Sequence, residues 1–81
     1  MKAVFTKKAH KQLLKLPRSI HSLIVEKIIS LGIDQAGLNT RKLTNRVGFR
    51  LRVGDYRVIY ITTAREIVIL SVTHRKDAYR K

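Results

Sequence analysis

Cysteine is absent from this 81-residue sequence, and only five residues are acidic. Without cysteine the chain has neither a disulfide framework nor a thiolate metal site. Three scattered histidines and five dispersed carboxylates do not make a plausible zinc or calcium site, so we expect no metal ion and no cofactor. Any chemistry that the protein performs is therefore expected to be metal-free.

Long apolar runs are missing as well. No uninterrupted apolar stretch approaches the roughly 18 residues that a membrane span requires. The N-terminus also lacks the apolar segment of a signal peptide. We therefore expect a cytoplasmic protein that makes no contact with a membrane.

Positive charge is what the sequence has in excess. Lysine and arginine outnumber the acidic residues by 18 to 5, which gives a formal net charge of +13. This charge exceeds what solubility requires and points to a polyanionic target or an acidic partner. The length suits one domain, and neither repeats nor low-complexity segments divide the chain, so we expect residues 1–81 to fold as a single domain.

The first half of the chain has helical periodicity after a short apolar start. Residues 1–5 suit a brief strand, and Thr6 is placed to cap the helix that follows. Apolar side chains recur at intervals of three and four in residues 7–16, and again from Pro17 to Gly32. Pro17 suits the start of the second helix and Gly32 the C′ position at its end, so the pattern predicts a helical hairpin.

Two further apolar side chains widen the stripe of the second helix. Val25 and Ile29 lie beside the main repeat rather than within it. Such a wide apolar surface favours burial against the first helix, and a patch that is kept for a partner is the alternative. We expect both side chains to be buried.

The second half of the chain changes its period. Residues 33–46 are rich in Gly, Asn and Thr and are expected to form a loop across the core. Residues 49–53 and 56–61 alternate, and residues 67–73 form a nearly continuous β-branched run. The predicted fold is therefore a small α+β domain with the order β-α-α-β-β-β, in which the helical hairpin packs on an antiparallel sheet.

A two-residue turn fixes the faces of the first two of these strands. Gly54-Asp55 is typical of a tight hairpin and pairs Arg52 with Arg57 across it. Six side chains then share the core face: Phe49, Leu51, Val53, Tyr56, Val58 and Tyr60. The opposite face carries Arg50, Arg52 and Arg57, so one side of the sheet is core and the other is cationic.

The last strand cannot be oriented in the same way. The turn through residues 62–66 has no decisive signal, and one added residue would reverse the face on which Ser71 and Thr73 lie. Residues 74–81 are too few for more than an extended end or one helical turn.

The cationic face of the predicted sheet indicates an anionic ligand. Neighbouring arginines repel one another, so a sheet that needed only a soluble surface would carry mixed charges. Guanidinium groups donate planar, bidentate hydrogen bonds to phosphate, and Arg75 and His74 follow the neighbouring strand, where they would complete a ring around one phosphodiester. An ordinary solvated surface, or a docking site for an acidic partner, is the alternative.

Metal-free RNA cleavage needs groups that move protons in addition to cations. A base takes the proton of the 2′-hydroxyl, cations hold the crowded phosphorane, and an acid protonates the leaving 5′-oxygen. Arginine is a poor base, so His74 or Tyr79 must handle protons. Tyr79 is also able to stack on a splayed base, or to serve only as a packing residue.

Two motifs in the chain resemble a known family. The stretch Phe49-Arg-Leu-Arg-Val-Gly-Asp-Tyr-Arg-Val-Ile-Tyr60 and the segment His74-Arg-Lys-Asp-Ala-Tyr79 are similar to those of the RelE toxins, within the RelE/ParE superfamily of bacterial toxin–antitoxin modules. The resemblance implies a RelE-like fold and an endoribonuclease that cuts mRNA, typically in the ribosomal A site. It also implies a cognate, RelB-like antitoxin that binds the toxin in a hetero-oligomer.

The same resemblance implies roles for single residues. Arg57 would contact the scissile phosphate, Arg75 would stabilise the transition state, and Tyr79 would orient or stack on the substrate base. His74 becomes the preferred proton acceptor, because arginine stands where well-known members have a basic lysine. Four further positions would bind the RNA phosphates: Arg50, Arg52, Arg41 and Lys42.

Two other functions compete with the nuclease. The ParE-like branch of the superfamily inhibits DNA gyrase through protein contacts and would not need Arg57, Arg75 and Tyr79 as a set. A basic nucleic-acid-binding module without catalysis needs only the charge.

Overall fold

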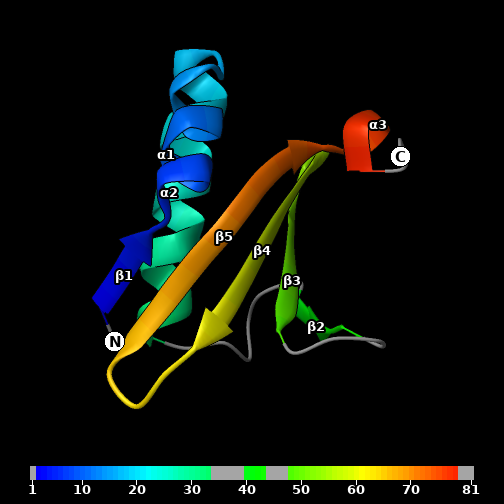
Figure 1. Ribbon diagram of the computed structural model, residues 1–81. Coiled ribbons are helices and arrows are strands. Elements are labelled where there is room, and N and C mark those ends of the chain that lie inside the picture. The colour runs from blue at the N-terminus through cyan, green and yellow to red at the C-terminus, as the bar shows by residue number, and fades with distance from the viewer. Residues whose placement is uncertain (1, 34–39, 44–47, 79–81) are drawn as a thin grey trace.

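The computed structural model describes residues 2–33, 40–43 and 48–78 (Figure 1). Its elements are β1 (Lys2–Phe5), α1 (Lys7–Leu14), α2 (Arg18–Ile33), β2 (Thr40–Lys42), β3 (Phe49–Val53), β4 (Tyr56–Thr62), β5 (Glu66–His74) and α3 (Arg75–Ala78). The predicted α+β order is confirmed, and β2 and α3 add to it. No helix in these described ranges is long and apolar enough to cross a membrane.

The five strands form one sheet in the order β1-β5-β4-β3-β2. β2 to β5 pair antiparallel, but β1 runs parallel to β5 from Lys2 opposite Glu66 to Phe5 opposite Ile69. The expectation of a wholly antiparallel sheet was wrong in this respect, and the sheet is mixed. A tight turn forces neighbouring strands to run antiparallel, whereas β1 and β5 are joined through most of the chain and have no such constraint.

The start of α1 is as the sequence predicts. The Thr6 side chain accepts a hydrogen bond from the Ala9 N–H at 3.1 Å and so caps the helix. α1 ends at Leu14, and the carbonyl of Pro17 accepts the first bond of α2 from the N–H of His21 at 2.9 Å. The first helix therefore ends two residues earlier than predicted, and Pro17 directly precedes α2 instead of being its first residue.

The end of α2 differs from the prediction. Gly32 does not terminate the helix, which continues to Ile33, and only Gly48 and Gly54 have a positive φ among the described residues. A C′ glycine would have to adopt the left-handed conformation, and Gly32 instead keeps the helical one. The C′ assignment was therefore wrong.

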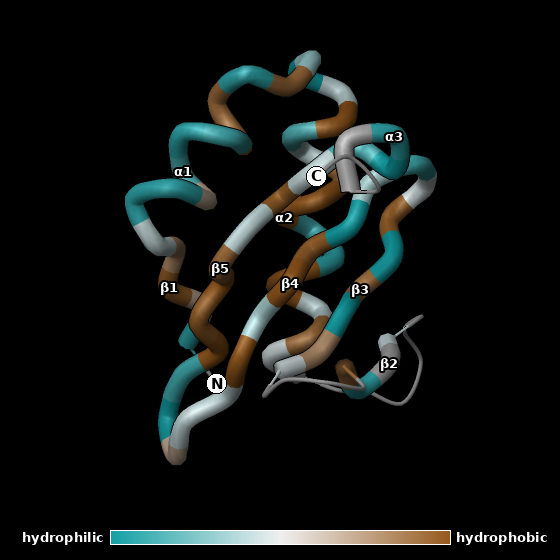
Figure 2. The backbone as a smooth tube through the Cα atoms, turned by 45° about the vertical axis from the view of Figure 1, so that its right-hand side comes forward, coloured by the Kyte–Doolittle hydropathy of each residue, from teal (hydrophilic) through white to brown (hydrophobic). Residues whose placement is uncertain are grey.

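The two long helices lie on the same side of the sheet (Figure 1). α1 packs mainly on β5 and β1, and α2 packs on β1 and β3, so each helix buries its apolar stripe against strands. Figure 2 shows the resulting contrast between the mostly hydrophilic α1 and the apolar runs of β4 and β5. Val25 packs against the core as expected, but Ile29 is 59% exposed. Its predicted burial was wrong, because it lies beside the buried stripe of Ile24, Ile28 and Leu31 and not within it.

The predicted loop over residues 33–46 contains a short strand. Thr40–Lys42 pairs with β3, with Arg41 opposite Arg50 and Lys42 opposite Phe49. A three-residue polar segment has no periodicity that reveals a strand, and only the neighbouring edge of β3 provides its hydrogen-bond partners.

The predicted hairpin is confirmed residue by residue. Arg52 lies opposite Arg57 across the turn, and Gly54 has a φ of 58°. A type II′ turn needs this positive φ at its first central residue, where glycine adopts it without strain. The cationic and apolar faces of β3 and β4 follow from this register.

A β-bulge in β5 decides the orientation that the sequence leaves open. Ile59 lies opposite Ser71 and Tyr60 lies opposite Ile69, so Leu70 is an extra residue on β5. Beyond the bulge Thr73 lies opposite Arg57, and both Ser71 and Thr73 are placed on the cationic face. His74 consequently lies on the helix-facing side.

Two side chains, one from the N-cap residue of α1 and one from the helix itself, cover the edge of β5 where β1 ends. The Thr6 hydroxyl donates to the Leu70 carbonyl at 3.2 Å, and the Gln12 Oε1 accepts from the Val72 N–H at 2.7 Å. These bonds satisfy backbone groups that would otherwise face the open edge. The end of β5, which leads into α3, is held in place as a result.

The core lies between the sheet and the two helices. Its buried members are Ala9, Leu13, Ile24, Ile28, Leu31, Leu51, Val53, Val58, Tyr60, Ile67, Ile69 and Val72. Four of the six predicted core-face residues are among them, and the other two, Phe49 and Tyr56, are partly buried and pack against the core. Tyr60 stacks on Phe49 with ring centroids 5.3 Å apart.

Replacing Tyr60 with phenylalanine is expected to make the protein less sensitive to alkali. Burial raises the pKa of the Tyr60 hydroxyl above its ordinary value of 10.0, and the neighbouring Thr40 side chain lowers the pKa only in part. No described group meets the hydroxyl with full hydrogen-bond geometry. Below about pH 10 the phenol is neutral in both the folded and the unfolded chain, and above it the unfolded chain loses its proton first, so stability falls as the pH rises.

The measurement is the melting temperature of both proteins from pH 8 to 11. The wild-type curve should fall more steeply than that of Tyr60→Phe above about pH 10. Parallel curves over the whole range would show that this hydroxyl does not contribute.

Candidate functional site

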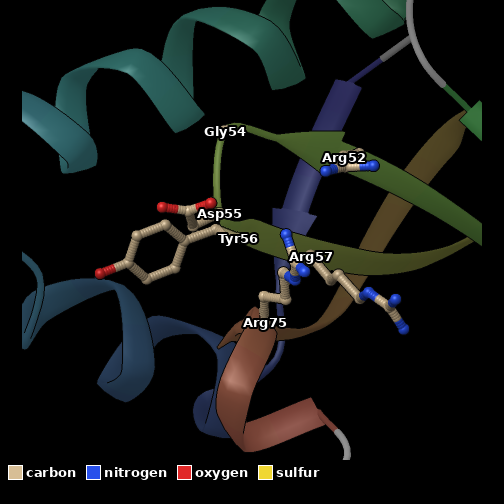
Figure 3. Close-up of a pocket in the computed structure, with 6 residues that line it drawn as sticks. All are labelled: Arg52, Gly54, Asp55, Tyr56, Arg57 and Arg75. Atoms are coloured by element: carbon tan, nitrogen blue, oxygen red, sulfur yellow. The ribbon is translucent and has the colours of Figure 1, made fainter.

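A hollow of about 200 Å³ opens where the β3–β4 turn meets α3 (Figure 3). Its lining residues are Arg52, Gly54, Asp55, Tyr56, Arg57 and Arg75. Three of these carry guanidinium groups and one carries a carboxylate, so the site is strongly cationic. It is of a size to admit a phosphate with its adjoining sugar atoms.

Two features of the backbone bring the three arginines together. The hairpin register pairs Arg52 with Arg57 on the face away from the helices. The Arg75 N–H donates to the carbonyl of Asp55 at 2.6 Å, which joins the start of α3 to the β3–β4 turn. Figure 3 shows the Arg75 side chain extending from α3 toward β4 beside Arg57. Arg57 and Arg75, which the sequence predicts to lie near each other, therefore line the same hollow.

The other phosphate-binding candidates lie outside this hollow. Arg50 is half-buried opposite Ile59 on the same face of the sheet, and the backbone of Arg41 is in register with it. The side chain of Arg41 lies outside the described parts of the structure. Lys42 is opposite Phe49, whose side chain belongs to the helix-facing side, so the register separates Lys42 from the arginines.

His74 also lies apart from the arginine hollow. It is opposite Tyr56 on the helix-facing side, with the two rings edge to face and their centroids 5.0 Å apart. It lines a second hollow of about 280 Å³, together with Gln12, Lys15, Leu16, Tyr56, Val72 and Thr73. The sequence placed His74 beside Arg75 in one site, but the bulge at Leu70 puts the last residue of β5 on the helix-facing side, whereas Arg75 begins α3 and lines the arginine hollow.

Tyr79, the fourth predicted catalytic residue, is not among the described residues. Three residues that line the hollow were missed as site residues, namely Gly54, Asp55 and Tyr56. Their signal was the turn itself, because residues that connect two paired arginines must lie beside them. Tyr56 lines both hollows and forms part of the boundary between them.

No group of three or more potential metal-ligating side chains comes together within the described ranges. The arginine hollow has guanidinium donors and a single carboxylate, and arginine does not bind cations. Its chemistry is therefore that of an anion site, in which bidentate hydrogen bonds hold phosphate or carboxylate groups.

Comparison with known proteins identifies the class to which this fold and site belong. Residues 3–79 match the family model described as the ParE toxin of the type II toxin–antitoxin system parDE. The match covers nearly the whole chain, so the chain belongs to this family of toxins. No curated protein matches it.

Solved structures place the chain more closely among RelE-like toxins of the RelE/ParE superfamily. The RelBE2 toxin–antitoxin complex of Mycobacterium tuberculosis contains a chain that is 30% identical, with a TM-score of 0.80 and coverage of 91% of this chain and 96% of that one. The RelB–RelE complex of Methanococcus jannaschii gives 26% identity, a TM-score of 0.80 and 94% coverage of both chains. The intact RelBE complex of E. coli, at 17% identity and a TM-score of 0.76, covers 90% of this chain and 94% of that one and shares the fold.

Proposed function

We propose that this toxin is an endoribonuclease that cleaves mRNA, in the ribosomal A site, without a metal ion. The observation that carries the proposal is the hollow that arginines from β3, β4 and α3 line together. A site that only bound a partner protein would not need three arginines around a volume of phosphate size. The likeness to RelE toxin structures supports the same assignment.

The proposed reaction is an attack of the 2′-hydroxyl on the adjacent phosphorus. The 2′-hydroxyl gives its proton to a base as the new bond joins the 2′-oxygen to phosphorus. The bond from phosphorus to the 5′-oxygen breaks, and the 5′-oxygen takes up a proton from an acid. Negative charge builds on the phosphoryl oxygens in the transition state, where Arg57 and Arg75 would donate hydrogen bonds. Arg52, and Arg50 further along β3, would hold the neighbouring phosphates.

Proton transfer is the part of the mechanism for which the hollow offers fewest groups. Among the described residues that line it, only Asp55 and Tyr56 have side chains of a kind that exchanges protons, and the Tyr56 ring packs against His74 on the helix-facing side. His74 and Tyr79 are the residues that the sequence indicates for this task. The arginines supply electrostatic stabilisation in every case.

The proposal includes an antitoxin partner. The related chains come from toxin–antitoxin complexes with RelB. An acidic or amphipathic segment of a RelB-like protein would neutralise part of the +13 charge and silence the toxin in a hetero-oligomer. Translated mRNA as the target places the action of the free toxin in the cytoplasm.

A second function is favoured by one specific observation. The matching family model is described as the ParE toxin, so inhibition of DNA gyrase is the competing proposal. Gyrase inhibition through protein contacts would not depend on the arginine hollow. A non-catalytic basic module would bind RNA without cutting it.

Inducing the protein in a bacterial cytoplasm is expected to arrest growth and to leave translated mRNAs cut within codons. Arg57→Ala should relieve both effects, because it removes a guanidinium from the hollow. The readouts are growth, primer extension on abundant messages and the rate of DNA synthesis. Intact messages with stalled replication would favour gyrase inhibition. Growth arrest without mRNA cleavage and without stalled replication would favour a non-catalytic binding module.

A further inference from the structure

We infer that His74 is a positioning residue, which fixes the first turn of α3 and thereby aims Arg75 into the hollow. The inference rests on the proposed function for its catalytic consequence. It assigns to His74 a different task from the proton transfer that the sequence indicates.

The first observation is a hydrogen bond to the imidazole ring. The Nδ1 atom of His74 accepts from the backbone N–H of Lys76 at 3.1 Å. His74 directly precedes α3, so its side chain bonds the second N–H of the helix, as an Asn or Asp cap does. A nitrogen that accepts this bond carries no proton and is not available as a base while the bond is present.

The second observation is that α3 needs such an anchor. The helix contains four residues, far fewer than an isolated helix requires to be stable. The Arg75 N–H is held by the Asp55 carbonyl at 2.6 Å, and the next N–H is held by the His74 ring. With both amides bound, the backbone direction at Arg75 is fixed, and its side chain points toward β4 beside Arg57 (Figure 3).

The third observation is that the ring is itself held away from the arginines. Tyr56 contacts it edge to face on the helix-facing side, and Gln12 of α1 and the C-cap residue Lys15 line the same second hollow. A substrate phosphate bound by Arg57 and Arg75 would lie in the other hollow. The His74 ring therefore holds the start of α3 from the helix-facing side and leaves the arginine hollow open to substrate.

Three proteins separate the two roles: the wild type, His74→Ala and His74→Asn. The Oδ1 atom of asparagine can accept the Lys76 N–H in the same way as Nδ1, but asparagine cannot act as a base. Both variants lose the contact with the Tyr56 ring, so this loss is matched between them. The measured quantity is the single-turnover rate of mRNA cleavage on programmed ribosomes.

The positioning role predicts that His74→Ala slows cleavage by about 100-fold, the effect of a misplaced catalytic group, whereas His74→Asn stays within about 5-fold of wild type. Equal, large losses in both variants would overturn it and return His74 to proton transfer. Wild-type rates in both variants would overturn it as well, because neither the cap nor the ring would then matter.

A measurement without substrate keeps the inference distinct from the proposed function. Hydrogen exchange of the Lys76 amide should be slow in the wild type and in His74→Asn, with loss of protection in His74→Ala. Equally fast exchange in all three would overturn the cap. If the wild type cleaves no mRNA, the nuclease proposal fails, whereas the exchange data still decide whether His74 holds α3.

Discussion

Replacing Arg75 with alanine is expected to slow the single-turnover cleavage of mRNA on programmed ribosomes by about 100-fold or more. The Arg75 side chain is exposed and lines the arginine hollow, where it would donate to phosphoryl oxygens only as their charge develops. Loss of one such donor typically costs 100- to 1000-fold in rate. The hydrogen bond from its N–H to Asp55 belongs to the backbone and remains, so the melting temperature should not change.

The matched control for this variant is Arg65→Ala. Arg65 is also exposed and has the same charge, but it lies in the β4–β5 turn, at the opposite end of β4 from the hollow. The Arg65→Ala variant should cleave mRNA at a rate within about threefold of wild type, because the charge that it lacks is distant from the hollow and screened by solvent. Equal losses in the two variants would mean that general basicity, rather than the hollow, governs the activity.

Replacing Leu51 with alanine is expected to cost about 2 to 5 kcal/mol of unfolding free energy. Leu51 is 1% exposed and lies on β3 between Arg50 and Arg52, with its side chain on the opposite face of the sheet. Its truncation would leave a cavity in the core beneath the cationic face. A chain of this length has a total stability of about 4 to 12 kcal/mol, so much of it would be lost.

Urea unfolding of Leu51→Ala and Leu14→Ala measures this effect against its control. Leu14 has the same side chain but is 63% exposed on α1, so its truncation should change the unfolding free energy by less than about 0.5 kcal/mol. Similar values for the two variants would contradict the assignment of Leu51 to the core.

The sheet was the part of the fold that the sequence predicted best. Alternation through β3 and β4, with one glycine in a two-residue turn, determined the register and so placed Arg52 opposite Arg57. These patterns are local, and a turn of fixed length leaves one register in which the apolar face is buried.

The features that were missed depend on contacts between distant segments. The strand β2 forms because the edge of β3 provides its hydrogen-bond partners. The bulge at Leu70 orients the end of β5, and no residue type in that part of the sequence indicates it. The position of His74 on the helix-facing side follows from this orientation, and sequence adjacency to Arg75 gave the opposite expectation. The predictions of a helix end at Gly32 and of burial at Ile29 were wrong, because the packing of neighbouring segments decides where a helix ends and which of its side chains are buried.

The chemical nature of the new RNA ends tests the central claim most directly. Attack by the 2′-hydroxyl at a phosphate that is held by the arginine hollow leaves a 2′,3′-cyclic phosphate, or the 3′-phosphate formed from it, and a 5′-hydroxyl. Messages cut by the wild type on ribosomes should carry these ends, and a 2′-O-methyl group at the cleavage position should abolish cutting. Ends with a 3′-hydroxyl and a 5′-phosphate, or cutting that persists beside the 2′-O-methyl group, would contradict the mechanism.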